Sequence, residues 1–304
     1  MTGAQIAAAA RRQNSVIPRR SAADTWSGRV FRAFMLGAVG VAFLGLGAII
    51  WDFASDGVPV LSWDFVTSFP SRVIPQNAGI ESAIVGTVYL MLICAFLVIP
   101  LGVMTAVYLE EYADGSRWYN RMIEVNIQNL AGVPSVVYGI LGLAFIVRGP
   151  LGMGPVLLAG GITLALLVLP VVIIVAREAI RAVPSSIREG SLALGATQWQ
   201  TIRRQVLPAS IPGIATGVIL AVSRALGETA PLLLVGATVF VTFDPTPFGT
   251  DGYSAMPVQI FNYAIAPEEE LRTLAAAGII VMLAVLLAMN SFAIWLRNRY
   301  EQRW

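Results

Sequence analysis

Residues 176–210 read AREAIRAVPSSIREGSLALGATQWQTIRRQVLPAS, a charged segment in a chain that is otherwise strongly apolar. Connections between helices usually run about 2–8 residues, so a segment of this length needs a structure of its own. Residues 186–189 and 197–200 both have the S/T-x-x-E/Q pattern of a capping box, which predicts two short helices. Gly195 stands where the first would end in a left-handed residue, and Pro208 should end the second.

The predicted helix–turn–helix carries apolar side chains on both of its helices. Leu192 and Leu194 lie in the first helix, and Trp199 and Ile202 lie in the second. Two short isolated helices cannot bury such faces against each other, so the segment needs a protein partner or the membrane surface. A solvated amphipathic linker is the alternative interpretation.

Long stretches without charge lie on both sides of this segment. A membrane-spanning helix needs about 20 apolar residues. The sequence therefore predicts an all-α integral membrane protein with six transmembrane helices. These helices are expected at 33–51, 82–109, 125–147, 149–176, about 212–239 and 273–296.

The positions of the arginines predict the orientation. All twenty basic residues are arginine, and sixteen of them fall on one predicted side against three on the other. By the positive-inside rule, both termini are cytoplasmic in a bacterial cytoplasmic (inner) membrane. The expected parts are an Arg-rich cytoplasmic tail (1–32), a transmembrane domain (33–296) with a cytoplasmic segment at 177–210, and a short C-terminal tail (297–304).

The first span lacks a small-x-small cleavage site, which favours an uncleaved anchor over a signal peptide.

Composition excludes several classes of function. The chain is 57% hydrophobic and 12% charged, whereas soluble domains are about 45–50% apolar and about 25% charged. It contains no histidine, so a Ser-His-Asp triad and an HExxH zinc site are impossible. It contains no lysine, so it cannot form a Walker A loop, and any ATP must bind another polypeptide. We expect no catalytic residue, metal site or cofactor in this chain, and the net charge of +2 does not indicate nucleic-acid binding.

Part of the charged segment resembles a known motif. Glu189-Gly190-Ser191, three residues, Gly195, nine residues and Gln205-Val206-Leu207-Pro208 resemble the EAA loop of ABC-importer permeases, E-A-A-x3-G-x9-I-x-L-P. Gly190 and Ser191 replace the two alanines, and Gln205 replaces the isoleucine. The resemblance implies that an ATPase subunit docks on this loop, through Glu189, Gly190, Ser191, Gly195, Leu207 and Pro208.

Two further segments narrow the resemblance. LAGVPSVVYG at 130–139 and SRALGETAPLL at 223–233 are similar to signatures of phosphate-specific permeases. Together with the loop, they resemble the A-type (PstA) permease family of bacterial phosphate ABC importers over about residues 80–240. The resemblance implies the type I ABC-importer permease fold and a heterodimer with a homologous C-type permease. It also implies two ATPase subunits, which bind ATP and Mg²⁺, and an extracytoplasmic phosphate-binding protein.

Arg224 and Glu228 are the charged residues inside a predicted span. Each charge at the bilayer centre costs about 2.5–3.5 kcal/mol on insertion scales. They lie four residues apart, so they are expected to share one helix face. The pair either neutralises itself or lines the substrate pathway, with the planar donors of Arg224 matching an oxyanion such as phosphate. We predict the pathway role, with Glu228 as counter-charge or gate.

Small residues in the third predicted span indicate close helix contacts. Membrane helices approach each other through glycine and serine. We predict helix packing or a gate, rather than substrate binding, at Gly132, Pro134, Ser135 and Gly139. The acidic residues Glu110, Glu111 and Asp114 at the end of the second span are predicted to form a solvated turn.

Other functions remain open at this point. An ABC permease for molybdate, sulfate or a phosphonate would carry the same polar pair, because similar oxyanions carry similar charge. A self-contained secondary transporter or channel would need no ATPase subunit, and the docking-like loop argues against it. A membrane enzyme is disfavoured by the absence of histidine, lysine and clustered metal ligands.

Overall fold

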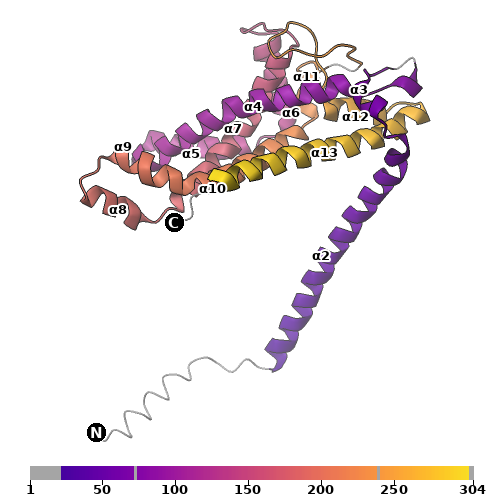
Figure 1. Cartoon of the computed structure of the whole chain (residues 1–304). Coiled ribbons are helices and arrows are strands. Elements are labelled where there is room, and N and C mark those ends of the chain that lie inside the picture. The colour runs from indigo at the N-terminus through magenta and orange to yellow at the C-terminus, as the bar shows by residue number, and fades with distance from the viewer. Residues whose placement is uncertain (1–21, 72–73, 238–239, 301–304) are drawn as a thin grey trace, which may run out of the picture. The chain divides into compact units, whose positions relative to one another are not determined.

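The computed structural model describes residues 22–71, 74–237 and 240–300, and all regular structure in these ranges is helical (Figure 1). The chain divides after Asp52 into two units. Most of the predicted N-terminal tail and residues 301–304 lie outside the described ranges.

The first unit holds most of helix α2 (Ala22–Gly57), which contains the first predicted span. The helix runs without a break through residue 32, where the sequence placed the end of the tail. None of its described side chains between Trp26 and Asp52 is buried.

The second unit is built around four long helices. They are α4 (Glu81–Val107), α7 (Leu157–Arg181), α10 (Leu207–Leu226) and α13 (Glu269–Tyr300). Counted with α2, five helical segments of the described chain are long and apolar enough to cross a membrane, and a bent pair makes a sixth if it is one span. The prediction of an all-α membrane protein is therefore confirmed.

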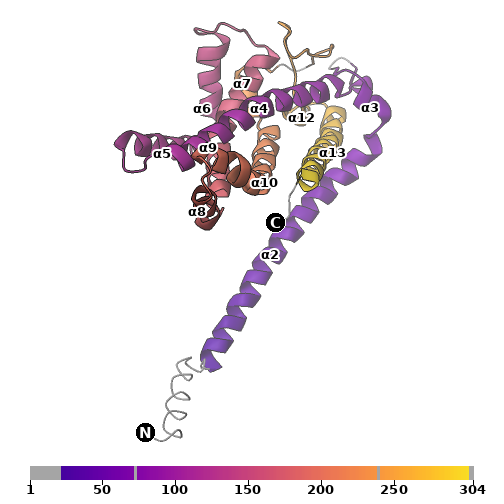
Figure 2. The same cartoon turned by 60° about the vertical axis from the view of Figure 1, so that its left-hand side comes forward.

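The third predicted span, 125–147, is not one straight helix. Helix α5 (Trp118–Ala131) and helix α6 (Ser135–Leu141), which continues as the π-helix η4 (Gly142–Val147), meet at 105°. Figure 2 shows the steep angle between α5 and α6. Pro134 has an extended ψ of 139° before the first residue of α6 and has no N–H, so the helix breaks there.

The fifth predicted span, 212–239, is also divided. Helix α10 ends at Leu226, and a shorter helix α11 (Ala230–Leu234) follows after three residues. Gly227 closes α10, and Pro231 stands in the first turn of α11, where its missing N–H costs nothing. Glu228 therefore lies between two helices and not within one.

The core lies where α4, α7 and α10 pack together. Leu90 and Val98 of α4, Leu164 and Val172 of α7, and Ala221 of α10 are buried in one cluster. In a membrane, such contacts stabilise the fold mainly through van der Waals packing, since lipid is as apolar as the side chains. This packing brings α4, α7 and α10 into direct contact with one another.

Short helices cover one end of the second unit. These are α3 (Trp63–Thr67), α12 (Met256–Ala264) and the 3-10 turns η1 (Val58–Val60) and η2 (Pro75–Asn77). The buried Tyr263 hydroxyl donates to the carbonyl of Gly79 at 2.7 Å, which fastens α12 to the start of α4. The segment after α7 lies at the opposite end (Figures 1 and 2).

Candidate functional site

Residues 185–206 form the α8–α9 element, which consists of α8 (Ser185–Ala193), α9 (Gln198–Thr201) and the π-helix η5 (Ile202–Val206). The turn between α8 and α9 depends on Gly195, whose φ is +84°. Its N–H donates to Leu192 O at 2.9 Å, and the N–H of Ala196 donates to Ser191 O at 3.2 Å. This is the Schellman pattern of a helix C-terminus, and the predicted left-handed Gly195 is confirmed.

One of the two predicted capping boxes is present. The Thr197 hydroxyl accepts from the N–H of Gln200, and the Gln200 side chain accepts from the N–H of Thr197. The box predicted at Ser186 is wrong. Helix α8 already begins at Ser185, after Pro184, and no side chain caps it.

The prediction that Pro208 ends the second helix is also wrong. The π turn η5 leads directly into α10, and Pro208 lies in the first turn of α10. A π turn has the hydrogen-bond pattern i→i+5, so the chain enters α10 with a shifted register. Pro208 is tolerated there, since a residue in the first turn of a helix needs no N–H.

The outer face of the α8–α9 element is apolar and open. Leu194 is 91% exposed, and Leu192 and Trp199 are exposed as well. Between the helices lies an open groove of about 420 Å³, and the Ser191 and Thr201 hydroxyls, 2.9 Å apart, join the two helices. The groove is lined by Ser186, Ile187, Gly190, Ser191, Leu194, Ala196, Gln200, Arg204 and Gln205.

The structure places the six predicted docking residues in two positions. Glu189, Gly190 and Gly195 are exposed on the element, and Ser191 is half-buried at its groove. Leu207 and Pro208 are half-buried at its base, where the chain enters α10. Ile202 and Val206 of the same element are buried, Val206 among side chains of α4, α7 and α10. The element therefore presents one face outward and rests the other on the bundle.

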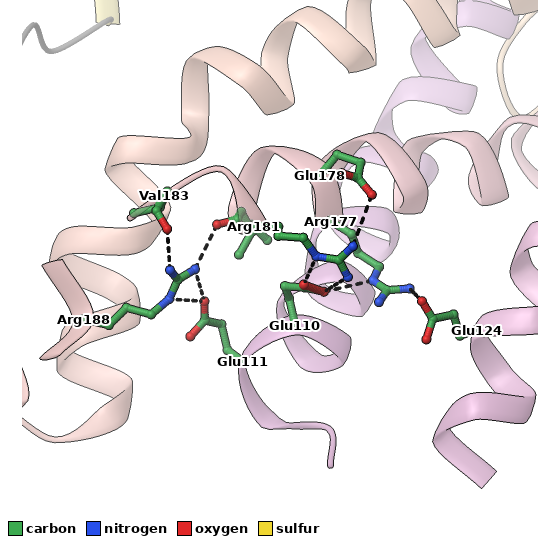
Figure 3. A network of polar contacts seen from close by, with 9 residues as sticks. Glu110, Glu111, Glu124, Arg177, Glu178, Arg181, Val183 and Arg188 are labelled. Carbon is green, nitrogen blue, oxygen red and sulfur yellow. Dashed lines mark hydrogen bonds and ion pairs between the residues drawn. The ribbon is translucent and has the colours of Figure 1, made fainter. Parts of the chain in front are cut away.

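A group of ion pairs, which we call the charged base, lies beneath the element. It consists of Glu110, Glu111, Glu124, Arg177, Glu178, Arg181 and Arg188 (Figure 3). Glu110 lies in η3 (Tyr108–Tyr112), a π-helix that continues α4. Its carboxylate accepts from Arg181 Nε at 2.6 Å and from Arg177 Nε at 3.2 Å, and Arg177 also pairs with Glu124 of α5 at 3.0 Å. These contacts join α4, α5 and α7.

Glu111 makes the contacts that reach the α8–α9 element. Its Oε1 accepts from Arg188 of α8, from Nε at 3.0 Å and Nη2 at 2.8 Å. The same guanidinium donates to Ile180 O in the last turn of α7 at 2.9 Å and to Val183 O, just after α7, at 2.6 Å. The backbone oxygen of Glu111 accepts from Nε2 of Gln198 in α9. One residue at the end of α4 thus holds both α8 and α9.

The predicted solvated turn at 110–114 is wrong for two of its three acids. The side chains of Glu110 and Glu111 are only 13% and 9% exposed. Asp114 is exposed, and hydrogen bonds from the hydroxyl and backbone N–H of Ser116 hold its pKa below the usual value. The excess of arginine on the same predicted side was the signal in the sequence, because those cations need nearby carboxylates.

Arg224 and Glu228 form an ion pair, with Nε and Oε1 3.6 Å apart. They do not share a helix face, because α10 ends at Leu226 and Glu228 follows it. In this single chain the Arg224 side chain is 60% exposed and the Glu228 side chain 17%. The guanidinium is therefore accessible, whereas the carboxylate is largely enclosed.

The two signature segments of the sequence meet in space. Gly139 of α6 is buried, and a Cβ there would lie 2.7 Å from the Pro231 Cα and 2.8 Å from the Leu234 side chain. Gly132 and Pro134 are exposed at the bend between α5 and α6, and Ser135 is half-buried. Of the four predicted packing residues, Gly139 is the buried one, and it lies in close contact with α11. Among the described residues, no group of three or more metal-ligating side chains is placed to hold a metal ion.

These features, a helical membrane bundle with an amphipathic element at one end, are those of a transport permease. The chain belongs to the family of binding-protein-dependent transport system inner membrane components, which matches residues 98–303. It is 36% identical over 230 residues to the phosphate transport system permease protein PstA 1 of Mycobacterium tuberculosis, covering 74% of this chain and 73% of the relative. It is 30% identical to the phosphate transport system permease protein PstA of Yersinia pestis, and the match covers 93% of this chain and 95% of the relative.

The fold has relatives among solved structures. The crystal structure of a bacterial alginate ABC transporter, in complex with an alginate-bound periplasmic protein, contains a chain that matches with a TM-score of 0.68 at 18% identity. The match covers 93% of this chain and 99% of that chain. The predicted type I ABC-importer permease fold and the resemblance to PstA permeases are confirmed. The chain is a multi-pass transport subunit, not an enzyme, and the transport systems of its family depend on a binding protein.

Proposed function

We propose that this chain is the transmembrane permease subunit of an ATP-driven importer that moves inorganic phosphate into the cell. The observation that carries the proposal is the identity of 30–36% to phosphate permeases, over most of the chain. The two segments that are similar to phosphate permeases also form one contact in the structure, Gly139 against Pro231.

The proposed assembly has five polypeptides. A homologous C-type permease completes the pore, two ATPase subunits carry ATP and Mg²⁺, and an extracytoplasmic phosphate-binding protein delivers the substrate. The lack of lysine supports this division, because a Walker A loop cannot form in this chain. The arginine asymmetry supports a cytoplasmic membrane location with both termini inside the cell.

The ATPase docks on the α8–α9 element in this proposal. The exposed Leu194 and the groove beside it offer an apolar contact that no part of the described chain covers. Glu189 is exposed at the same surface and has no ion-pair partner among the described residues. The element therefore combines an apolar centre with polar surroundings, as protein interfaces do.

Arg224 is the residue proposed to guide the anion. Its guanidinium is a permanent cation with paired donors, and it is accessible on this chain. A cation alone would hold phosphate too tightly for release. Glu228, 3.6 Å away, neutralises the site when it is empty and competes with the anion when it is filled.

The deciding experiment is reconstitution. The chain is copurified with its partners, placed in proteoliposomes with ATP inside, and assayed for uptake of radioactive phosphate. Uptake should require ATP and the binding protein, and a roughly tenfold excess of sulfate, molybdate or methylphosphonate should leave it nearly unchanged. Competition by one of these anions would identify the other oxyanion class, and uptake by this chain alone would identify a secondary transporter.

A further inference from the structure

The α8–α9 element needs a rigid connection to the bundle if ATPase movement is to reach the membrane. Its covalent connections run only to α7 and α10, through residues 182–184 and Leu207. Helix α4 has no chain connection to it, although α4 packs in the core against both α7 and α10. Val206 packs against α4 through apolar contacts, and the polar contacts of Glu111 join α8 and α9 to the end of α4.

We propose that Glu111 and Arg188 are a positioning pair that holds the α8–α9 element against the cytoplasmic end of α4. Through this pair, a movement of the docked ATPase displaces α4 together with α7 and α10. The proposal rests on the proposed function, because it assigns a mechanical role within the ATPase-docking site.

The geometry of Arg188 supports this role. Its three guanidinium nitrogens make four hydrogen bonds, two to the Glu111 carboxylate and one each to Val183 O and Ile180 O. A planar guanidinium can do this with its donors in fixed directions, whereas a lysine ammonium is a point charge on a flexible stem. Arg188 thus fixes the angle between the end of α7, the start of α8 and the end of α4.

The position of Glu111 supports it as well. The carboxylate is 9% exposed, so water competes little for its hydrogen bonds. Its backbone oxygen holds Gln198, which means that α8 and α9 are attached to one residue of η3. Glu110, the preceding residue, binds Arg177 and Arg181 of α7 and makes no hydrogen bond or ion pair with α8 or α9 in the described part of the chain. The two neighbouring acids therefore have separate tasks.

The test compares three variants of the purified complex in proteoliposomes. Glu111→Gln removes the negative charge of the pair. Arg188→Lys keeps the positive charge but loses the planar, paired donors of the guanidinium. Asp114→Asn removes an exposed carboxylate nearby and serves as the matched control. ATP hydrolysis and uptake of inorganic phosphate are measured together, and their ratio is the readout.

Glu111→Gln should assemble and hydrolyse ATP, but phosphate uptake per ATP should fall roughly tenfold, within the range of coupling energies for such residues. Arg188→Lys should lie between that variant and wild type, and Asp114→Asn should equal wild type. An unchanged ratio of phosphate uptake to ATP hydrolysis in Glu111→Gln overturns the proposal. This includes an equal fall in uptake and hydrolysis, because that is the result expected from a purely structural role. If Glu111→Gln does not accumulate, Arg188→Lys decides: a lowered ratio supports the pair and a wild-type ratio overturns it.

Failure of the proposed function looks different in the same assay. In that case the wild-type complex shows no ATP-dependent phosphate uptake. If it transports another oxyanion instead, the ratio is measured with that anion, and the positioning pair is tested unchanged.

Discussion

The carboxylate of Glu111 accepts two hydrogen bonds from the guanidinium of Arg188, although 77 residues separate them in the sequence. The pair joins the end of one core helix to the element that precedes another. Because the carboxylate is almost fully enclosed, each partner is needed to compensate the charge of the other. This contact makes the loop between α7 and α10 a part of the folded bundle.

Loss of one partner should therefore lower stability. Arg188→Gln leaves the Glu111 carboxylate without its cation and frees two carbonyls, so we expect a loss of about 2–4 kcal/mol. Thermal unfolding of the detergent-solubilised protein measures this. Arg117→Gln, which removes an exposed arginine paired with Asp114, should change stability by less than about 0.5 kcal/mol. Equal melting temperatures for the two variants would contradict the structural importance of the pair.

Gly195 should tolerate only residues that adopt a left-handed conformation. At its φ of +84°, a β-branched side chain is strained by about 1–3 kcal/mol, so Gly195→Val should misplace α9. We expect normal membrane insertion but loss of ATPase copurification and of uptake. Gly195→Asn should retain most of both, since asparagine tolerates this region.

Glu189→Lys should have the same outcome as Gly195→Val for a different reason. Glu189 is exposed on the docking face, so the substitution reverses a surface charge without disturbing the fold. Copurification of the ATPase and uptake are the measurements. Normal ATPase retention with full uptake in both variants would remove the docking assignment.

The anion pathway makes a sharper prediction at Arg224. Arg224→Gln should abolish phosphate uptake while leaving assembly with the partner permease intact, and Arg224→Lys should restore uptake only in part. Glu228→Gln should impair transport without loss of protein. If the pair exists merely to neutralise itself, the double variant Arg224→Leu/Glu228→Leu should transport normally, and that result would falsify the pathway assignment.

Close contact between α6 and α11 can be tested at Gly139. An added Cβ meets the Pro231 backbone at 2.7 Å, so Gly139→Ala should force the two helices apart and destabilise the protein by about 1–3 kcal/mol. Gly132→Ala is the matched control, since its Cβ would meet nothing nearer than Asn129 O at 3.5 Å. The melting temperature and uptake should fall for the first variant and hold for the second.

Topology can be tested with reporter fusions. A reporter after Arg204 or at the C-terminus should behave as cytoplasmic, and one inserted near Asp56 or Gly252 should behave as external. The arginine asymmetry of sixteen to three is the reason for this expectation. An external C-terminus would mean that the orientation or the number of spans differs from the proposal.

Features that depend on a few neighbouring residues could be predicted from the sequence. The left-handed Gly195 and the Thr197 capping box follow from local backbone chemistry, and both are present. The apolar spans α4, α7 and α13 follow from composition. Their boundaries differ from the expected ones by one to five residues, except that α7 begins eight residues later than expected, at Leu157. Local rules were insufficient at Pro134 and Pro208. The first breaks a helix, whereas the second stands in the first turn of α10, where no N–H is needed.

The charged base could not be predicted in the same way. Glu110 lies 67 and 71 residues from its two arginines, and nothing in their sequence spacing specifies which cations pair with which acids. The division of the fifth predicted span into α10 and α11 could not be predicted from the sequence either, because glycine and proline, here Gly227 and Pro231, are tolerated inside many membrane helices. These features depend on how α4, α7 and α10 pack, which hydrophobic pattern alone does not determine.

The π turns η3 and η5 have a consequence for chain length. The first, η3, follows α4 and contacts the α8–α9 element through Glu111, and the second, η5, is the last part of that element before α10. A π turn contains one residue more than an α turn, so removing one residue from 202–206 can close it to an α turn while both flanking segments keep their register. A deletion within α10 itself would rotate all later side chains by about 100°. A length change of one residue is therefore tolerated at η3 and η5 and at few other places in the bundle.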